Sequence, residues 1–390
     1  MREAMDAPAF PTGATMQERP GTRLAPAEFS RAAPLFADLD EHLAAQAVLP
    51  GDVPGEVVVD DPRRPRAALA WTGHRFHLAG DPSLARFNSA LQRLFADEIF
   101  PHAQAAGQTE FEIYPAAPDR DAQIGLILAD KHPIRDTRHY YEWDAALTGA
   151  APGAGWRDRL PAGFAVRDVD ERLLADRSLG QVDDLIEEVQ SEGGTVEDFL
   201  SKRFGVCLVH DDEIVGWCVS EFNSGRRCEI GIATDARYRR RGLATLLTAA
   251  FIERGQMRGI RRIGWHCWAG NHPSGATARR AGLEKRADYP VYFAWFDPAA
   301  NLAVNGNVRL RRGEYGAALA WFRRALAANG ALTWAFLPAA CAAAMAGEPD
   351  AALSYAQRAV AAGVEITRIR ESAYLRSLHG TASWNALIAG

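Results

Sequence analysis

An arginine-rich loop between a strand-like segment and a helix-like segment is the stretch best suited to bind an anion. Residues 238–245 read Tyr-Arg-Arg-Arg-Gly-Leu-Ala-Thr. The first backbone N–H groups of a helix lack acceptors within the helix and lie at the positive end of its dipole, so they attract phosphate. Gly242 would let a phosphate approach the backbone closely, because it has no side chain. Such a loop is also a common solvated helix start, and it is neither a Walker A loop nor a three-glycine dinucleotide loop.

Other reactive side chains downstream of the loop do not form a complete catalytic or metal-binding motif. His266 and His272 flank Cys267, but a zinc site needs a fourth ligand, and His272 precedes a proline in a loop-like stretch. We therefore predict no metal. Ser274 lacks the Gly-x-Ser-x-Gly surroundings of a nucleophile, so a coenzyme contact or a helix cap is the expected role of its hydroxyl.

The segments around the loop predict an antiparallel meander followed by alternating helices and strands. Apolar residues at alternate positions, separated by polar turns, predict strands at 205–210, 214–222, 228–234, 261–268 and 291–296. Apolar residues at helical spacing, each run followed by a glycine, predict helices at 242–258 and 274–281. The expected order is β-β-β-α-β-α-β.

The N-terminal third predicts a separate α+β domain. Its patterns favour a helix at 84–105 and strands at 55–60, 67–71, 75–79 and 110–114. Residues 151–155 are rich in proline and glycine and are the best linker candidate, so we place a boundary near Pro161. Residues 1 to about 30 contain prolines and no apolar run after a basic start, which indicates a loose cytoplasmic tail rather than a signal peptide or membrane anchor.

The last ninety or so residues contain an internal repeat. The sequence Gly-Glu-Tyr-Gly-Ala-Ala-Leu at 313–319 returns as Gly-Glu-Pro-Asp-Ala-Ala-Leu at 347–353, an offset of 347 − 313 = 34 residues. This is the tetratricopeptide period, and helical apolar spacing follows each copy. Two repeats are fewer than such arrays usually need, so we expect the helices to pack on the preceding domain or on another subunit. Either they only stabilise the protein or they bind a peptide or protein.

Composition excludes several classes of protein. Of the 390 residues, 48% are hydrophobic and 24% are charged, which is typical of a soluble globular protein of two or three domains. The net charge of −5 gives no global basic field, so a nucleic-acid partner is not expected. The five cysteines form no Cys-x-x-Cys pair and predict neither a disulfide framework nor a zinc site.

The anion loop resembles the coenzyme A loop of the GNAT N-acyltransferases. Arg239-x-x-Gly242-x-Ala244 matches the Arg/Gln-x-x-Gly-x-Gly/Ala signature of that superfamily, and it lies after the expected meander and before the expected helix. This context outweighs the interpretation of the loop as a plain helix start. The resemblance covers roughly residues 33–297 and is strongest from Phe204 onward.

Downstream segments add to the resemblance and point to one branch of the superfamily. Asn271-x-x-Ser274 followed by Gly282-Leu283 is similar to the pattern after the fifth strand of GNAT proteins. Three short segments look most like the branch that includes zwittermicin A resistance proteins; they are residues 229–234, 265–267 and 289–292. In that branch the N-terminal part is itself a degenerate GNAT-like half.

The resemblance implies acetyl-coenzyme A, or another acyl-coenzyme A, as co-substrate. Its pyrophosphate would lie on the N–H groups of residues 240–245, and its pantetheine arm would pair with backbone around residues 232–234. The coenzyme-binding residues it implies are Ile232, Thr234, Arg239, Arg240, Arg241, Gly242, Leu243, Ala244, Thr245, Asn271 and Ser274.

Catalysis of N-acylation requires a base, because an amine with a pKa of about 10.4 is protonated near neutral pH. We expect Glu229 to be this base, directly or through water, with Glu221 as the alternative. The other interpretation of Glu229 is a solvated strand carboxylate. Backbone N–H near Ile232 would stabilise the oxyanion. Many GNAT enzymes carry a tyrosine seven residues after the asparagine, but that position here is Ala278. Tyr289 is therefore the candidate acid, Tyr292 or Ser274 the substitutes, and leaving of the thiolate without an acid is a further alternative.

The expected fold is α+β: a GNAT fold with a degenerate GNAT-like N-terminal half, plus an all-α tetratricopeptide-like domain. The expected segments are a tail at 1–30, the degenerate half at 31–160, the catalytic GNAT domain at 161–298 and the helical repeats at 299–390. The expected function is cytoplasmic N-acetylation of a primary amine on a small metabolite, an antibiotic or a peptide. The alternative is an acyl-coenzyme A sensor or scaffold that binds a protein partner, or a second copy of the chain, through the repeats.

Overall fold

The structure is a computed structural model that describes residues 21–389, apart from residues 118, 129–130, 148–154 and 193. The chain forms two compact units. The first unit comprises Met1–Phe95, Glu112–Ile127 and Arg135–Tyr292. The second comprises Ala96–Phe111, Leu128–Ile134 and Phe293–Gly390.

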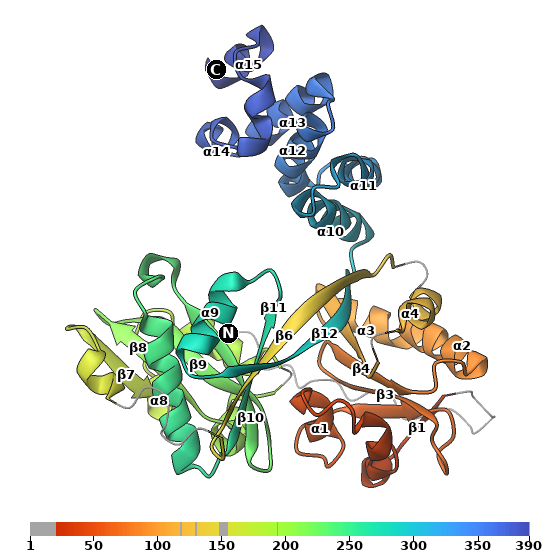
Figure 1. The fold of residues 1–390 in the computed structure, drawn as a ribbon, viewed down its shortest axis with the longest axis vertical. Helices are drawn as coiled ribbons and strands as arrows, with labels where there is room; N and C mark the ends of the chain where they lie inside the picture. Colours follow the sequence, from red (N-terminus) through yellow and green to blue (C-terminus); the bar gives the residue numbers. More distant parts are fainter. Residues whose placement is uncertain (1–20, 118, 129–130, 148–154, 193, 390) are drawn as a thin grey trace. The chain divides into compact units, whose positions relative to one another are not determined.

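One mixed sheet organises the described part of the chain. Its strand order is β1-β2-β3-β4-β5-β12-β6-β11-β10-β9-β8-β7 (Figure 1). The strands are β1 (Thr22–Arg23), β2 (Glu56–Val59), β3 (Ala67–Thr72), β4 (Arg75–Gly80), β5 (Glu110–Pro115), β6 (Ile134–Asp144), β7 (Phe164–Asp168), β8 (Gly205–His210), β9 (Glu213–Ser224), β10 (Arg227–Thr234), β11 (Arg262–Trp268) and β12 (Glu284–Trp295).

The sheet contains the same sequence of elements twice. In the second half, the antiparallel strands β8, β9 and β10 lead into α8 (Leu243–Met257), the parallel strand β11, α9 (His272–Arg280) and β12. This confirms the expected order β-β-β-α-β-α-β. In the first half, β2, β3 and β4 are antiparallel and lead into α2 (Ala85–Leu94), α3 (Phe100–Ala105), β5 parallel to β4, α4 (Asp121–Ile127) and β6. The N-terminal half therefore repeats the layout of the C-terminal half.

The two halves exchange their last strands. Strand β6 ends the first half but pairs antiparallel with β11 of the second half, from Arg262↔Asp144 to Trp268↔Arg138. Strand β12 ends the second half but lies between β5 and β6 (Figure 1). A strand of the first half thus pairs with the strands of the second half, which carries the arginine-rich loop.

Strands β10 and β11 run together only at their beginnings. They pair in parallel from Arg227↔Arg262 to Glu229↔Gly264, whereas β10 pairs with β9 along its whole length to Thr234. Strand β11 continues beside β6 to Trp268. Among the residues that the structure describes, the edge of β10 that faces β11 is therefore unpaired beyond Glu229, so the two strands diverge there.

Helices cover both faces of the second half. Helix α8 buries Leu243, Leu246 and Leu247 in one core with residues of β8 to β11, as the helical spacing predicts. The opposite face is covered by α5 (Glu171–Leu174), α6 (Val182–Gln190) and α7 (Val196–Lys202), which form a second core with β8 and β9. The short helix α1 (Leu43–Val48) comes from the N-terminal half and contacts both β9 and β10.

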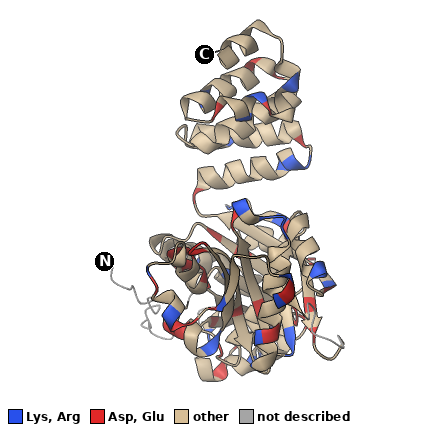
Figure 2. Ribbon diagram, turned by 90° about the vertical axis from the view of Figure 1, so that its left-hand side faces the viewer, with Lys and Arg blue, Asp and Glu red and all other residues tan. Residues whose placement is uncertain are grey.

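The second unit contains a helical array. Its helices are α10 (Pro298–Arg311), α11 (Tyr315–Ala328), α12 (Phe336–Met345), α13 (Pro349–Ala361), α14 (Ile366–Arg370) and α15 (Ala382–Ala389). Gly313 and Gly347, one repeat apart, both have positive φ and close equivalent helix-ending turns. Most of this ribbon is uncharged (Figure 2), because small apolar residues of α11 to α13 form its core. The array has helix pairs at the repeated positions, and its classification as tetratricopeptide-like stays a prediction.

Several expected elements differ in extent. Strand β12 begins at Glu284 and not at residue 291. Its first residues are mostly exposed and polar, so no apolar pattern in the sequence indicated them. The helix expected at 84–105 is divided by a π-helical turn, Phe95–Ile99, just before Pro101, which lacks an N–H and cannot continue a regular helix. Strands β6 and β7 and helices α1 and α4 to α7 were not predicted.

The two segments expected to be unstructured fall partly outside the described residues. Residues 1–20 of the expected tail and 151–154 of the expected linker lie outside them. Residues 21–30 are folded, which corrects the expectation of a loose tail for that part: they form β1 and the start of a 3-10 helix, Pro26–Arg31, with Leu24 and Phe29 buried. No helix in the described part of the chain is both long and apolar enough to cross a membrane.

Candidate active site

The arginine-rich loop forms an open turn at the start of α8. Gly242 is the N-cap of α8 and has a φ of 79°, and Arg240 also has a positive φ, of 61°. A Cβ atom built on Gly242 would meet nothing within 4 Å, so the space above it is open. The Gly242 carbonyl accepts hydrogen bonds from the N–H groups of Thr245 and Leu246, which leaves the preceding N–H groups at the helix end for a ligand. This geometry suits a phosphate.

The three arginines of the loop have different surroundings. Arg239 Nε donates to the Thr234 carbonyl at 2.9 Å and so ties the loop to the end of β10. Arg241 donates to the Arg237 carbonyl at 3.1 Å and lies over the Tyr238 ring. Arg240 is exposed beside the open turn. Two arginines therefore shape the loop, and Arg240 is free to meet an anion.

The diverging strands lie directly before this loop. Ile232 and Thr234, which were expected to contact the coenzyme, belong to the part of β10 that pairs only with β9. An extended ligand segment could pair with this unpaired edge, as an added strand would. The anion loop and the free edge are consecutive in sequence, so one long ligand with a phosphate end could use both.

The corresponding loop of the N-terminal half is closed. A Cβ atom on Gly80, at the end of β4, would collide with the backbone of Arg66 and Ala67. Asp81 follows, and its carboxylate already accepts from the N–H and hydroxyl of Ser83. A carboxylate at this position repels phosphate. The N-terminal half therefore has no equivalent open anion turn at Gly80; the degeneracy of this half stays a prediction.

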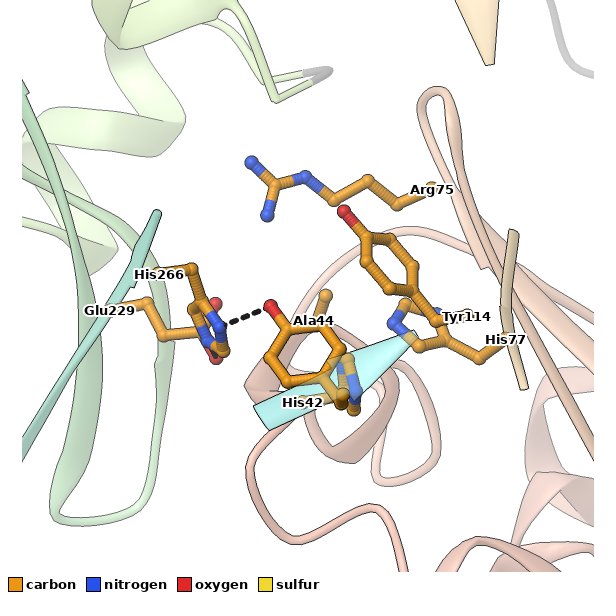
Figure 3. A pocket seen from close by; sticks show the side chains of 8 residues that line it. His42, Ala44, Arg75, His77, Tyr114, Glu229 and His266 are labelled. Carbon is orange, nitrogen blue, oxygen red and sulfur yellow. Dashed lines mark hydrogen bonds and ion pairs between the residues drawn. The ribbon is translucent and has the colours of Figure 1, made fainter. Parts of the chain in front are cut away.

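A small buried cavity of about 10 Å³ lies where the two halves meet, with space for roughly one water. Figure 3 shows Glu229 and His266 reaching it from β10 and β11, and Arg75, His77 and Tyr114 from the N-terminal half. The remaining lining residues are His42, Ala44 and Tyr289.

Glu229 and Tyr289 are joined through His266. The imidazole Nε2 lies 3.1 Å from Glu229 Oε1, and the Tyr289 hydroxyl lies 2.6 Å from Nδ1 of the same ring. Burial raises the pKa of Tyr289 well above its usual value, so this hydroxyl keeps its proton. Tyr289 then donates to Nδ1, and Nε2 carries the ring proton and donates to Glu229. The two expected catalytic residues are thus parts of one hydrogen-bonded chain.

Glu229 is held as a carboxylate in spite of its burial. Only 4% of its side chain is exposed. Burial alone would raise its pKa, but His266, Arg75 and the backbone N–H of Leu43 outweigh burial and lower the pKa below its usual value. The Leu43 N–H donates to Glu229 Oε1 at 2.7 Å. This environment differs from the solvated strand carboxylate that we considered from sequence.

Glu221, the alternative base, lies in a different electrostatic environment. Its side chain is 20% exposed and its Oε2 is 3.1 Å from Arg75 Nη2. Burial raises the pKa of Glu221 to about 8, although Arg75 acts in the opposite direction; Glu192, Glu229 and Glu188 raise it further. A carboxyl with this pKa exchanges its proton near neutral pH.

The other expected site residues hold the local structure. Asn271 caps α9 by accepting from the Ser274 N–H at 3.2 Å, so the cap is the asparagine and not the Ser274 hydroxyl. That hydroxyl accepts from the Trp265 indole at 3.0 Å. Ala278 is fully buried, and Tyr292 donates to Asp121, away from His266. The structure brings Glu229 and Tyr289 together but does not bring Tyr292 to them.

Sequence reasoning missed the contribution of the N-terminal half. His42, Arg75, His77 and Tyr114 line the cavity, but none belongs to a recognisable motif. His77 is 1% exposed, and burial and Arg75 lower its pKa to about 3, so it is neutral. His266 was considered only as a metal ligand. The His266 ring lies between the rings of Tyr140 and His42. This position depends on the exchange of strands between the two halves, so local sequence could not predict it.

Comparison with known proteins agrees with this geometry. The family model described as GNAT acetyltransferase matches residues 33–292, about two thirds of the 390 residues. The uncharacterised N-acetyltransferase YdfB of Bacillus subtilis (strain 168) is 24% identical over 249 residues, which are 64% of this chain and 88% of that protein. The crystal structure of a GCN5-related N-acetyltransferase-like protein from Streptococcus suis 89/1591 superposes with a TM-score of 0.51 at 23% identity, covering 70% of this chain and all of that one, which shows a shared fold.

Proposed function

The chain belongs to the GNAT acetyltransferase family, whose members transfer an acyl group from acyl-coenzyme A, and we propose that this member transfers acetyl to a primary amine. The observation that carries the proposal is the open anion turn at the start of α8, placed directly after the free edge of β10. The pyrophosphate of acetyl-coenzyme A would lie on the N–H groups of residues 240–245 beside Arg240. The pantetheine arm would follow Ile232 to Thr234. Asn271 and Ser274 would act by fixing the start of α9.

The chemical step needs a proton acceptor beside the point where β10 and β11 diverge. The two candidates, Glu229 and Glu221, lie there on neighbouring strands, and Glu188 of α6 is a third carboxylate beside Gly231. One of the two candidates takes a proton from the ammonium form of the acceptor, directly or through a water in the cavity. Backbone N–H near Ile232 stabilises the oxyanion. Tyr289 is the candidate to protonate the thiolate, although a thiol of pKa about 8.5 can also leave unaided.

The acceptor is a primary amine of a small metabolite, an antibiotic or a peptide. A small acceptor would fit the resemblance to zwittermicin A resistance proteins. If the acceptor is a peptide or protein, the helical array would help to bind it, because stacked helix pairs form extended binding surfaces. The array would otherwise stabilise the chain or hold a second copy of it. All five cysteines are free and buried, which fits a reducing, cytoplasmic compartment.

A second candidate function is a sensor or scaffold that binds acyl-coenzyme A without turnover. The observation in its favour is Ala278, which stands where many GNAT enzymes have their tyrosine acid. Such a protein would keep the anion turn but need no base.

The experiment that separates these functions is release of free thiol from acetyl-coenzyme A in the presence of single primary amines: ethanolamine, putrescine, 2-phenylethylamine and lysine amide. The wild type should release thiol with at least one amine, and Gly242→Asp should abolish release. Gly259→Asp is the matched control, because Gly259 has a φ of 81°, has equally open space and lies at the other end of α8. Coenzyme binding without thiol release would favour the sensor.

A further inference from the structure

A bulge places two carboxylates against each other at the divergence of β10 and β11. The register of β9 and β10 shifts between Cys228↔Asn223 and Ile230↔Ser220. Two residues of β9, Glu221 and Phe222, therefore stand opposite the single residue Glu229. Bulges of this kind redirect side chains next to active sites. Here the bulge gives the two glutamates different surroundings.

Glu229 is already engaged by the protein. Its Oε1 accepts from the Leu43 N–H at 2.7 Å and lies 3.1 Å from His266 Nε2. Two donors on one oxygen stabilise the carboxylate and reduce its tendency to take another proton. The contact with Leu43 also anchors α1 of the N-terminal half on β10. These features suit a residue that positions other groups.

Glu221 has one oxygen held and one available. Its Oε2 lies 3.1 Å from Arg75 Nη2, and Arg75 also pairs with Glu192. No residue in the described part of the chain donates a hydrogen bond to Oε1. That oxygen lies over Gly231, since a Cβ atom on Gly231 would be only 2.8 Å from it; Glu188 Oε1 reaches the same place from α6, at 2.9 Å. Gly231 belongs to the part of β10 that has no partner in β11.

We propose that Glu221 is the residue that takes the proton from the acceptor ammonium, and that Arg75 of the N-terminal half holds its carboxylate over the unpaired part of β10. The inference rests on the proposed acyltransferase function and assigns the base within it. Glu229, with His266 and Tyr289, is then a positioning residue that seats the N-terminal half on the catalytic strands.

The charges around Glu221 are consistent with this role. Arg75 on β4 is the cation beside it, and the carboxylates of Glu192, Glu229 and Glu188 surround it from the region of α6 and from β10. A base works best when its pKa is near the working pH, and the pKa of Glu221 is raised to about 8 by burial. Arg203 is a second nearby cation and donates to the Glu221 backbone carbonyl at 3.2 Å, but the carboxylates still outnumber the two arginines and so attract a cationic amine.

The reaction balances with this assignment. Glu221 removes one proton from the ammonium and later releases it to water. The free lone pair of the amine forms the C–N bond, and the C–S bond breaks with its electron pair on sulfur. The second proton of the attached nitrogen reaches the thiolate, which leaves as thiol. The products are the amide, the free coenzyme and one proton.

The test compares the pH dependence of kcat in the wild type, Glu221→Gln and Glu229→Gln. It uses acetyl-coenzyme A and whichever of ethanolamine, putrescine, 2-phenylethylamine and lysine amide the wild type acetylates fastest. Glutamine at 221 keeps an acceptor for Arg75 but cannot take a proton. Glu221→Gln should lower kcat by about 10²- to 10⁴-fold near pH 7.5 and keep its acetyl-coenzyme A affinity. The deficit should shrink as the pH approaches about 10.4, where the amine is free without help. Glu229→Gln should keep the base and only displace the pH profile towards lower pH, because the Glu229 charge raises the pKa of Glu221.

Two results would overturn the assignment: an unchanged rate in Glu221→Gln, or a loss in Glu229→Gln that high pH alone repairs. A measurement without turnover keeps the test decisive if every amine fails, which would instead count against the proposed function. In ¹³C-carboxyl-labelled protein, the glutamate signal absent from Glu221→Gln should titrate near pH 8. A titration near the ordinary glutamate pKa would contradict the role of Glu221 whatever the acceptor is.

Discussion

The backbone N–H of Leu43 donates to Glu229 Oε1 at 2.7 Å, across 186 residues of sequence. Leu43 begins α1 of the N-terminal half, and Glu229 lies on β10 of the half that carries the anion turn. The N-terminal half is therefore a structural part of the candidate active site. It also supplies Arg75 and strand β6.

Two replacements of Glu229 should separate the effect of its negative charge on stability from the effect of its hydrogen bonds. Glu229→Gln keeps an oxygen for the Leu43 N–H and should change the free energy of unfolding little. Glu229→Leu leaves that buried N–H and His266 without their acceptor, and should lower stability by about 1–3 kcal/mol more than Glu229→Gln. Urea unfolding measures both, with the exposed Glu187→Leu as control. Equal stability of the two variants at residue 229 would show that the contact contributes little.

Removal of the Tyr289 hydroxyl should change the tautomer of His266. In the wild type, ¹⁵N spectra of labelled histidine should show a proton on Nε2 of His266, because Tyr289 donates to Nδ1 at 2.6 Å. Tyr289→Phe frees Nδ1 and should shift or broaden the His266 signals. The control is Tyr292→Phe, since that hydroxyl donates to Asp121 instead. Identical His266 signals in wild type and Tyr289→Phe would contradict the hydrogen-bonded chain.

The neutral, buried His77 should make the protein sensitive to acid. Burial and Arg75 lower its pKa to about 3, whereas an unfolded histidine titrates near 6.5. The unfolded state therefore binds a proton that the native state does not, so stability falls as the pH drops from about 6.5 towards 3. At pH 5 the loss from this residue is about 2 kcal/mol.

His77→Leu tests this origin of the acid sensitivity. The decrease in unfolding free energy between pH 7 and pH 5, measured by urea titration, should be smaller in His77→Leu than in the wild type by about 2 kcal/mol. The exposed His272→Gln is the control and should behave as the wild type does. An unchanged decrease in His77→Leu would mean that other groups cause it; His42, whose pKa burial also lowers, would be the next candidate.

Local pattern predicted the second half of the sheet closely. The expected strand at 205–210 is β8, and the helix expected at 242–258 is α8, Leu243–Met257. These elements have regular apolar spacing and clear ends. Strand β6 was missed because its first half, Ile134–His139, is largely polar and its partner β11 lies far along the sequence. The exchange of β6 and β12 depends on long-range pairing, which no local pattern reports.

The candidate site, like the sheet, could be predicted from local sequence only in part. The anion turn could be predicted because one short segment contains both its glycine and its helix start. The cavity could not, because Arg75 and His77 come to Glu229 only when the two halves share a sheet. The contrast between Glu221 and Glu229 was also hidden, because it arises from a bulge and from Leu43.

Calorimetric titration with acetyl-coenzyme A tests the central claim most directly. The wild type should bind in the micromolar range. The Arg240→Glu, Gly242→Asp double variant, in which the anion turn is negatively charged and obstructed, should bind at least about 100-fold more weakly, a change of roughly 2.7 kcal/mol. The control Gly259→Asp should bind as the wild type does. No binding by the wild type, or equal binding by the double variant, would contradict the assignment of the turn at Gly242 as the coenzyme site.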